Sequence, residues 1–92
     1  MGKPLQQARN EIRTMNERAE AMIDLAPKML ADHVIEDSPG RLRMIRKEPV
    51  GVVLQISPWN YPYITTINAL SAAVLAGNTL LLKHSSNTPL VG

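Results

Sequence analysis

The sequence predicts an α/β fold in which N-terminal helices precede a single strand, helix, strand unit. Apolar residues recur every three or four positions through the first 29 residues, which is typical of one helix face. The run from Val50 to Ser57 is β-branched and apolar on both faces, as in a buried strand of a parallel sheet. A helical pattern and a second short apolar run, "TLLLK", follow. This order defines a βαβ unit.

Length and composition set the class of protein. At 92 residues, the chain allows one small domain or a piece of a larger one. Hydrophobic residues make up 45% and charged residues 20%, which indicates a globular protein and not a disordered one. The net charge is +2, but the basic residues are scattered among acids, and the aromatic residues are one Trp and two Tyr. We therefore expect no nucleic-acid partner.

Several kinds of site and location are disfavoured. The chain has no cysteine, so it has neither disulfides nor a Cys-bearing metal site. His33 and His84 are far apart and lack metal-ligand spacing, so no metal is expected. The first ten residues, "MGKPLQQARN", lack the apolar core of a signal peptide. We expect a cytoplasmic protein.

The N-terminal segment, residues 1–40, is predicted to be helical. Pro27 is expected to end or reset the first helix, because proline cannot donate the backbone hydrogen bond, and a short second helix from Pro27 to Asp32 is one continuation. The apolar stripe is expected to pack against a neighbouring helix or domain in preference to forming a free coiled coil. Its members are Leu5, Ala8, Ile12, Met15, Ala19, Met22, Ala26 and Met29.

Turn residues separate this segment from the strands. The sequence "EDSPG", Glu36 to Gly40, favours a tight bend. Residues 41–49, "RLRMIRKEP", alternate imperfectly with basic residues on one face, which predicts an exposed or edge strand. The third segment, residues 50–92, contains the βαβ unit, with its helix over Pro62 to Ala76 and a stop at Gly77 and Asn78.

The region from Val50 to Leu82 carries no charge, so a membrane span is the rival interpretation. Tyr61 to Leu82 would be long enough to cross a hydrocarbon core of about 30 Å. Polar residues interrupt the run, however, and helix-stop and strand signals divide it into elements of the length found in soluble proteins. We therefore expect no membrane partner.

Polar residues follow both predicted strands of the βαβ unit. "ISPWNYP" places Trp59 and Asn60 after the first strand, and "KHSSNTP" places Lys83 and hydroxyl residues after the second. Open α/β sheets bind ligands at the carboxyl ends of their strands. The sequence therefore predicts a ligand crevice at this edge.

These motifs resemble the aldehyde dehydrogenase superfamily. The resemblance rests on "EPVGVVLQISPWNYP", "LAGNTLLLKHSSNTP" and, more weakly, "GKPLQQARNEI", and it extends over essentially the whole chain. Family members are several times longer, so the chain looks like an internal or N-terminal fragment. The resemblance implies late N-terminal helices in residues 1–40, an edge strand linked to the oligomerisation sheet in residues 41–49, and the start of a Rossmann-like NAD(P)-binding domain in residues 50–92. We expect an intact parent to be a homo-oligomer.

The family resemblance implies oxidation of an aldehyde, semialdehydes included, to a carboxylic acid with NADP or NAD. In such enzymes a Cys thiolate attacks the small-molecule aldehyde, a hydride passes to the nicotinamide, and a Glu-activated water hydrolyses the thioester. Without a Cys, this chain alone is expected to be inactive. The alternative is a truncated, catalytically inactive relative that acts as an assembly or binding module.

The resemblance also assigns roles to residues. Asn60 matches the family Asn whose amide donates to the oxyanion, although an Asn here could instead cap the helix that starts near Pro62. Ile56, Ser57, Pro58 and Trp59 match the segment that lies along the cofactor with backbone and ring surface. Core packing is the equal alternative for Trp59.

Three residues after the second strand complete the assignment. Lys83 matches the Lys that holds the adenosine ribose hydroxyls, whereas its alternative is a solvated charge. Ser86 stands where the family often has a Glu, which leaves room for a 2′-phosphate beside Lys83 and predicts that NADP is tolerated. His84 gives a faint resemblance to semialdehyde-oxidising members, but a plain exposed loop histidine is the favoured interpretation. No GxGxxG fingerprint occurs, so the nucleotide site depends on the resemblance.

Overall fold

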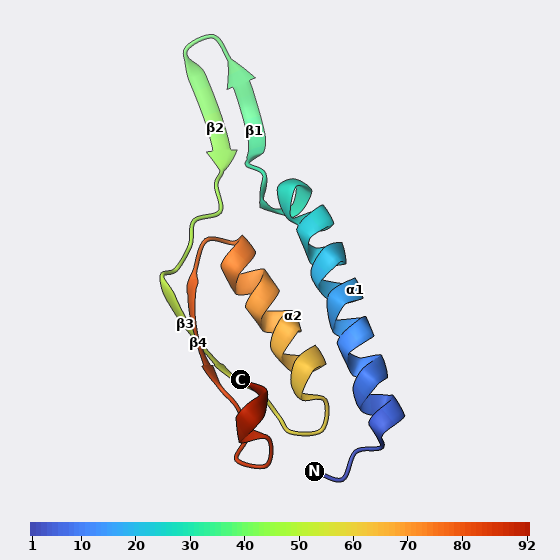
Figure 1. The fold of residues 1–92 in the computed structure, drawn as a ribbon. Coiled ribbons are helices and arrows are strands. Elements are labelled where there is room, and N and C mark those ends of the chain that lie inside the picture. Colours follow the sequence, from blue (N-terminus) through green and yellow to red (C-terminus); the bar gives the residue numbers. More distant parts are fainter.

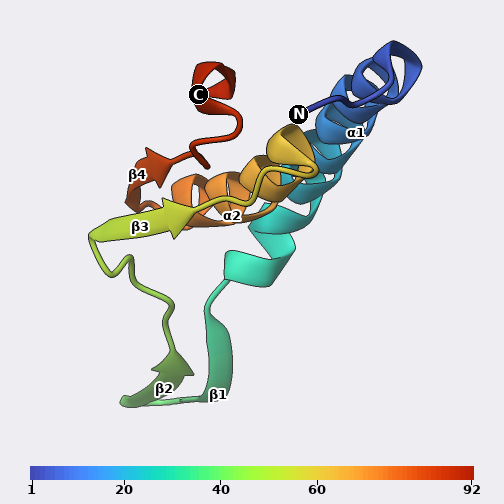
Figure 2. The same cartoon turned by 90° about the horizontal axis from the view of Figure 1, so that it is seen from below.

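The computed structural model describes residues 1–92 as an elongated mixed α/β arrangement with extents of 63 × 24 × 13 Å. Its elements are α1 (Leu5–Leu30), β1 (His33–Ser38), β2 (Arg41–Ile45), β3 (Val52–Ile56), α2 (Pro62–Leu75), β4 (Thr79–Lys83) and the 3-10 turn η1 (Pro89–Val91). Helix α2 lies between α1 and the β3–β4 sheet, and the β1–β2 hairpin projects beyond the end of α1 (Figures 1 and 2). The predicted α/β fold is confirmed.

The first helix is longer than the sequence predicts. Helix α1 continues through Pro27 to Leu30, so the expected break at Pro27 and the separate second helix are wrong. Proline removes one backbone hydrogen bond, but only the last turn follows it. The ammonium of Lys47 donates to the carbonyl oxygens of Met29 at 2.6 Å and Ala31 at 3.5 Å. These bonds satisfy two of the carbonyls at the helix end that have no donor within the helix.

The apolar stripe of α1 is only partly covered. Ala8, Met15, Ala19, Met22 and Ala26 are partly buried, in a helix that packs on α2. Leu5, Ile12 and Met29 are exposed to 67, 45 and 60%. Toward the end of α1, apolar side chains of both helices line a hollow of about 380 Å³: Met22, Leu25, Ala26, Met29, Leu30, Ala72 and Leu75. The stripe thus packs against a neighbouring helix, as expected, but only part of it is covered.

The hairpin includes a strand that the sequence did not predict. Residues 1–40 are not helical throughout, because His33–Ser38 form β1, antiparallel to β2 from His33 opposite Ile45 to Ser38 opposite Arg41. The turn is therefore shorter than "EDSPG" and consists of Pro39 and Gly40, with φ of 75° at the glycine. The exposed strand predicted after it is confirmed as β2.

A bidentate ion pair closes the base of the hairpin. The guanidinium of Arg46 donates to the Asp32 carboxylate at distances from 2.8 to 3.2 Å. This hydrogen bonding holds the pKa of Asp32 below its usual range and raises that of Arg46 above its own. The pair links the end of α1 to the segment that leaves β2.

The βαβ unit has the predicted order and direction. β3 and β4 are parallel, in register from Val52 opposite Thr79 to Ile56 opposite Lys83. Helix α2 covers one face only, as Figure 2 shows, so Val52, Leu54 and Ile56 on the other face are each about two thirds exposed, at 66, 65 and 66%. The expectation that β3 is buried on both faces is therefore wrong for this two-stranded sheet. The buried apolar side chains are few, chiefly Ala73 and Pro62 on α2.

The connection from α2 to β4 is set by the predicted "GN" stop. Gly77 adopts a φ of 84°, a conformation that favours glycine. The Asn78 amide donates to Ala73 O at 3.2 Å, while its oxygen accepts from the backbone N–H groups of Val50 and Gly51 at 2.7 and 3.0 Å. Asn78 therefore joins the end of α2 to the start of β3. No helix in the structure combines the length and apolar character needed to span a membrane.

Candidate site at the sheet edge

The carboxyl ends of β3 and β4 meet at one edge. Ile56 lies opposite Lys83 in the parallel register, and the N–H of Ser57 donates to Lys83 O at 3.1 Å. The loop Pro58 to Tyr61 leaves β3 from this edge, and the segment containing Ser86 follows β4. The structure thus brings together the two segments that carry the predicted site residues.

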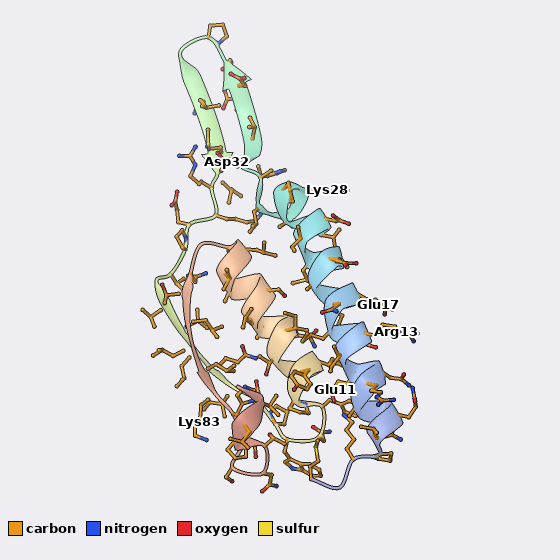
Figure 3. All side chains as sticks on the ribbon, in the orientation of Figure 1. Glu11, Arg13, Glu17, Lys28, Asp32 and Lys83 are labelled. Atoms are coloured by element: carbon orange, nitrogen blue, oxygen red, sulfur yellow. The ribbon has the colours of Figure 1, made fainter.

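The Lys83 side chain lies at the surface of this edge. It is exposed and makes one long hydrogen bond, 3.4 Å to the carbonyl of His84. Figure 3 shows Lys83 at the end of β4, on the side of the sheet away from α1. Ser86 is also exposed. Most of the donors of the Lys83 ammonium are free for a ligand.

Ser57 differs from the other predicted cofactor residues because it is only 3% exposed. Its Oγ accepts hydrogen bonds from Gln55 Nε2 at 3.0 Å and from Thr66 Oγ1 at 3.2 Å. Gln55 Nε2 also donates to the carbonyls of Thr65 and Thr66 at 3.1 and 3.0 Å. The Ser57 hydroxyl is therefore used in attaching β3 to α2. Because the Ser57 N–H is bound to Lys83 O, the carbonyl is the backbone group of Ser57 that is left to contact a ligand.

The loop itself presents its side chains to the surface. Pro58 and Asn60 are exposed, and Trp59 is 48% exposed. Trp59 is therefore not a core residue of this chain. Asn60 does not cap α2, because the N-cap position is Tyr61 and no N-cap side chain bonds to the helix. The helix-cap alternative for Asn60 is thus wrong, and its amide makes no hydrogen bond within the chain.

The cap of α2 comes instead from α1. Glu11 is 3% exposed, and its Oε1 accepts from the backbone N–H groups of Tyr63 at 2.8 Å and Ile64 at 3.3 Å. Pro62, the first helical residue, has no N–H to satisfy. The carboxylate therefore replaces an N-cap side chain as the acceptor for these N–H groups. It also adds a negative charge where the helix dipole favours one. Figure 3 shows Glu11 on the side of α1 that faces the start of α2.

Lys3 completes this arrangement. Its ammonium forms an ion pair with Glu11 Oε2, and the side chains are only 7% and 2% exposed. The same nitrogen donates to Asn60 O at 3.1 Å and lies 3.9 Å from the centre of the Tyr61 ring. Both ribbon views place the N-terminus beside the loop that precedes α2 (Figures 1 and 2).

Sequence reasoning missed Lys3 and Glu11 as functional candidates. Glu11 lies between Ala8 and Met15 at spacings of three and four, so it is a charged residue on the apolar face of the helix. A buried carboxylate requires a partner, which the sequence could have signalled. Both residues also belong to the "GKPLQQARNEI" motif.

His84 turns inward from the end of β4. Its two ring nitrogens are buried without a hydrogen-bond partner, and the ring lies with Leu82, Val91 and other side chains around a second hollow. The interpretation of His84 as an exposed loop histidine is therefore wrong. No group of three or more His, Cys, Asp or Glu side chains is close enough to hold a metal ion.

Known proteins resemble this chain in both structure and sequence. A structure of succinic semialdehyde dehydrogenase from Streptococcus pyogenes, in complex with NADP+, superposes with a TM-score of 0.86 at 29% identity over 97% of this chain and 19% of that one. The succinate-semialdehyde dehydrogenase [NADP(+)] of Mycobacterium leprae is 37% identical over 97% of this chain. The 3,6-anhydro-alpha-L-galactose dehydrogenase of Streptomyces coelicolor is 39% identical over 97%.

The chain spans about a fifth of the length of these relatives, 20% and 18% for the two curated sequences. The sequence model of the aldehyde dehydrogenase family matches residues 1–92, from the first residue of the chain to the last. The motifs that carry the resemblance therefore lie within a match that also covers the rest of α1 and the hairpin. On these findings, the chain belongs to the aldehyde dehydrogenase family.

Proposed function

We propose that this chain contributes the oxyanion donor and part of the cofactor edge to an enzyme that oxidises an aldehyde to a carboxylic acid with NADP or NAD. One observation carries the proposal. In a chain of this family, the parallel register places Ile56 opposite Lys83, so the loop with Asn60 and the Lys83 ammonium share one sheet edge. Open α/β sheets bind ligands at such an edge.

The residues at this edge fit a dinucleotide. Ile56 and Trp59 offer apolar surface, with 66% and 48% exposure, and Lys83 offers free donors for ribose hydroxyls. Ser86 adds no negative charge, so the Lys83 ammonium can pair with a 2′-phosphate. The relatives named for NADP(+), and the S. pyogenes complex, support NADP in particular. When bound, the nicotinamide supplies the hydride acceptor.

Asn60 is proposed to donate its side-chain amide to the oxygen that becomes negatively charged during aldehyde oxidation. A neutral donor held in place stabilises such a charge without needing to reorganise. The exposed amide has no competing partner in the chain, which supports this role. Semialdehydes are the proposed substrate class, because the relatives include succinate-semialdehyde and glutarate-semialdehyde dehydrogenases.

Other properties of the parent protein remain predictions. The β3–α2–β4 unit supports a Rossmann-like NAD(P)-binding domain over residues 50–92, with residues 41–49 linked to an oligomerisation sheet and residues 1–40 before them. Homo-oligomeric assembly is supported by the exposed apolar face of β3. A cytoplasmic location rests on the sequence alone.

The test uses a graft, in which residues 1–92 replace the matching segment of the S. pyogenes enzyme, since the two superpose with a TM-score of 0.86. We expect Asn60→Ala to lower kcat by about 10²- to 10³-fold, the usual cost of losing one oxyanion donor. Asn16→Ala is the matched control, because Asn16 is exposed on α1. An Asn60→Ala graft with unchanged kcat would refute the proposed role.

A binding module without catalysis is the second candidate. It is favoured by the apolar hollow of about 380 Å³ between α1 and α2 and by the uncovered face of β3. The same graft separates the two candidates. An active graft means that these residues can serve in catalysis, whereas a folded graft without any turnover favours the binding module.

A further inference from the structure

We propose that Lys3 and Glu11 are positioning residues that fix the Asn60 amide for catalysis. The inference rests on the proposed role of Asn60 and adds to it the groups that hold the loop. Lys3 precedes α1 and Glu11 lies in its second turn, yet both bind to the segment from Asn60 to Ile64. We call them the Lys3–Glu11 pair.

Glu11 fixes where α2 begins. Its Oε1 accepts from the N–H groups of Tyr63 and Ile64, the second and third residues of a helix that has no N-cap side chain of its own. These are the donors that an N-cap residue normally satisfies. Because Pro62 fixes φ and offers no N–H, the Glu11 carboxylate helps to determine how the chain enters the helix, which begins two residues after Asn60.

Lys3 fixes the backbone of Asn60 itself. The ammonium donates to Asn60 O at 3.1 Å, pairs with Glu11 Oε2 and lies over the Tyr61 ring. At the other end of the loop, the N–H of Ser57 is bound to Lys83 O. The loop backbone is thus anchored at Ser57 and at the carbonyl of Asn60, the residue that carries the amide.

The residues to which the Lys3–Glu11 pair bonds indicate that it positions the Asn60 loop and does not merely stabilise the fold. An ion pair whose side chains are 7% and 2% exposed costs desolvation, and a pair of apolar residues would fill the same space with less penalty. Apart from the bond between Lys3 and Glu11, all side-chain hydrogen bonds of the pair go to residues 60, 63 and 64. The geometry that the pair provides is therefore that of the Asn60 loop.

The test measures kinetics of the grafted enzyme, in which residues 1–92 replace the matching segment of the S. pyogenes protein. Glu11→Gln keeps the shape of the side chain but turns an amide donor toward the Lys3 ammonium. We expect kcat to fall by about 10- to 100-fold, since small misplacement of a catalytic group has costs of this size. The KM for NADP+ should change less than kcat, because the pair makes no hydrogen bond to Lys83 or to Ile56. Glu17→Gln, on the exposed side of α1, is the matched control and should leave kcat unchanged.

A double-mutant cycle with Asn60→Ala decides the mechanism. If Glu11 acts through Asn60, Glu11→Gln should lower kcat by no more than about twofold in the Asn60→Ala background. Losses that multiply in the double variant would overturn the proposal while leaving the role of Asn60 intact. An Asn60→Ala enzyme with full kcat would instead refute the proposed function.

If the Glu11→Gln graft does not fold, a second variant and a second measurement still test the proposal. Lys3→Met keeps the chain length, removes the ammonium and should show the same dependence on Asn60. In the 92-residue chain, hydrogen exchange at the Tyr63 and Ile64 amides should be slowed. Glu11→Ala, which removes the acceptor, should abolish that protection, whereas Glu17→Ala should not. Fast exchange at both amides in the unsubstituted chain would overturn the proposal.

Discussion

Asn78→Ala should destabilise the chain, because one side chain joins the end of α2 to the start of β3. Its oxygen accepts from the N–H groups of Val50 and Gly51, and its amide donates to Ala73 O. Alanine removes all three hydrogen bonds. It leaves the backbone bond from Thr79 N to Gly51 O as the neighbouring link between the strands.

The loss of stability in Asn78→Ala depends on how exposed the partners of the lost hydrogen bonds are. A hydrogen bond contributes about 1 kcal/mol net, so three bonds set an upper value of about 3 kcal/mol. Val50 is 84% exposed and Gly51 is also exposed, so water can replace the lost acceptor at these two N–H groups. The bond to Ala73, a buried residue, lacks this compensation. We therefore expect a loss of about 2 kcal/mol in the free energy of unfolding.

Urea-induced unfolding of the 92-residue chain, followed by circular dichroism, measures this loss. The transition midpoint should fall while the slope against urea stays constant, because Asn78→Ala changes little of the surface exposed on unfolding. Asn16→Ala, at an exposed site on α1, should change the free energy of unfolding by less than about 0.5 kcal/mol. An Asn78→Ala loss no larger than that of the control would refute the reasoning that this side chain holds the βαβ unit together.

Two further predictions concern charge. Ser86→Glu in the graft should raise the ratio of kcat/KM for NAD over NADP by about tenfold or more, because a carboxylate repels the 2′-phosphate; an unchanged ratio would show that Ser86 lies away from the ribose. The pKa of Asp32 is lower in the folded chain than in the unfolded chain. Its pairing with Arg46 therefore stabilises the hairpin base fully at pH values above the unfolded-state pKa of about 3.9. This contribution is lost as the pH falls through the lower folded-state pKa. Asp32→Asn should remove that part of the acid dependence, measured as hairpin amide shifts against pH, and an identical titration in the variant would contradict it.

Local patterns predicted the part of the fold that carries the site. The β-branched run of β3, the helical spacing of α2 and the stop at Gly77 and Asn78 are properties of short segments, and each element is found within two residues of its predicted limits. The shared edge of Ile56 and Lys83 followed from the parallel topology of a βαβ unit.

Features that depend on distant contacts were not predicted. The sequence of β1, "HVIEDS", has no clear apolar alternation, and most of its residues are exposed. It is a strand because β2 pairs with it. The helix continues beyond Pro27 to Leu30, where Lys47, on a later segment, binds carbonyls at its end. The pairing of Lys3 with Glu11, and their bonds to the Asn60 loop, depend on how α1 lies against α2. Periodicity in a single segment contains none of this information.

The link between Glu11 and the start of α2 also has a consequence for the order of folding. Glu11 and Tyr63 are 52 residues apart in the chain, and Lys3 and Asn60 are 57 apart. Such contacts close long loops, so they form after the local helices and slow the search for the native topology. During synthesis, α1 leaves the ribosome well before its partner loop exists and must wait with its apolar stripe uncovered. The Asn60 loop is therefore among the last parts of this segment to reach its final geometry.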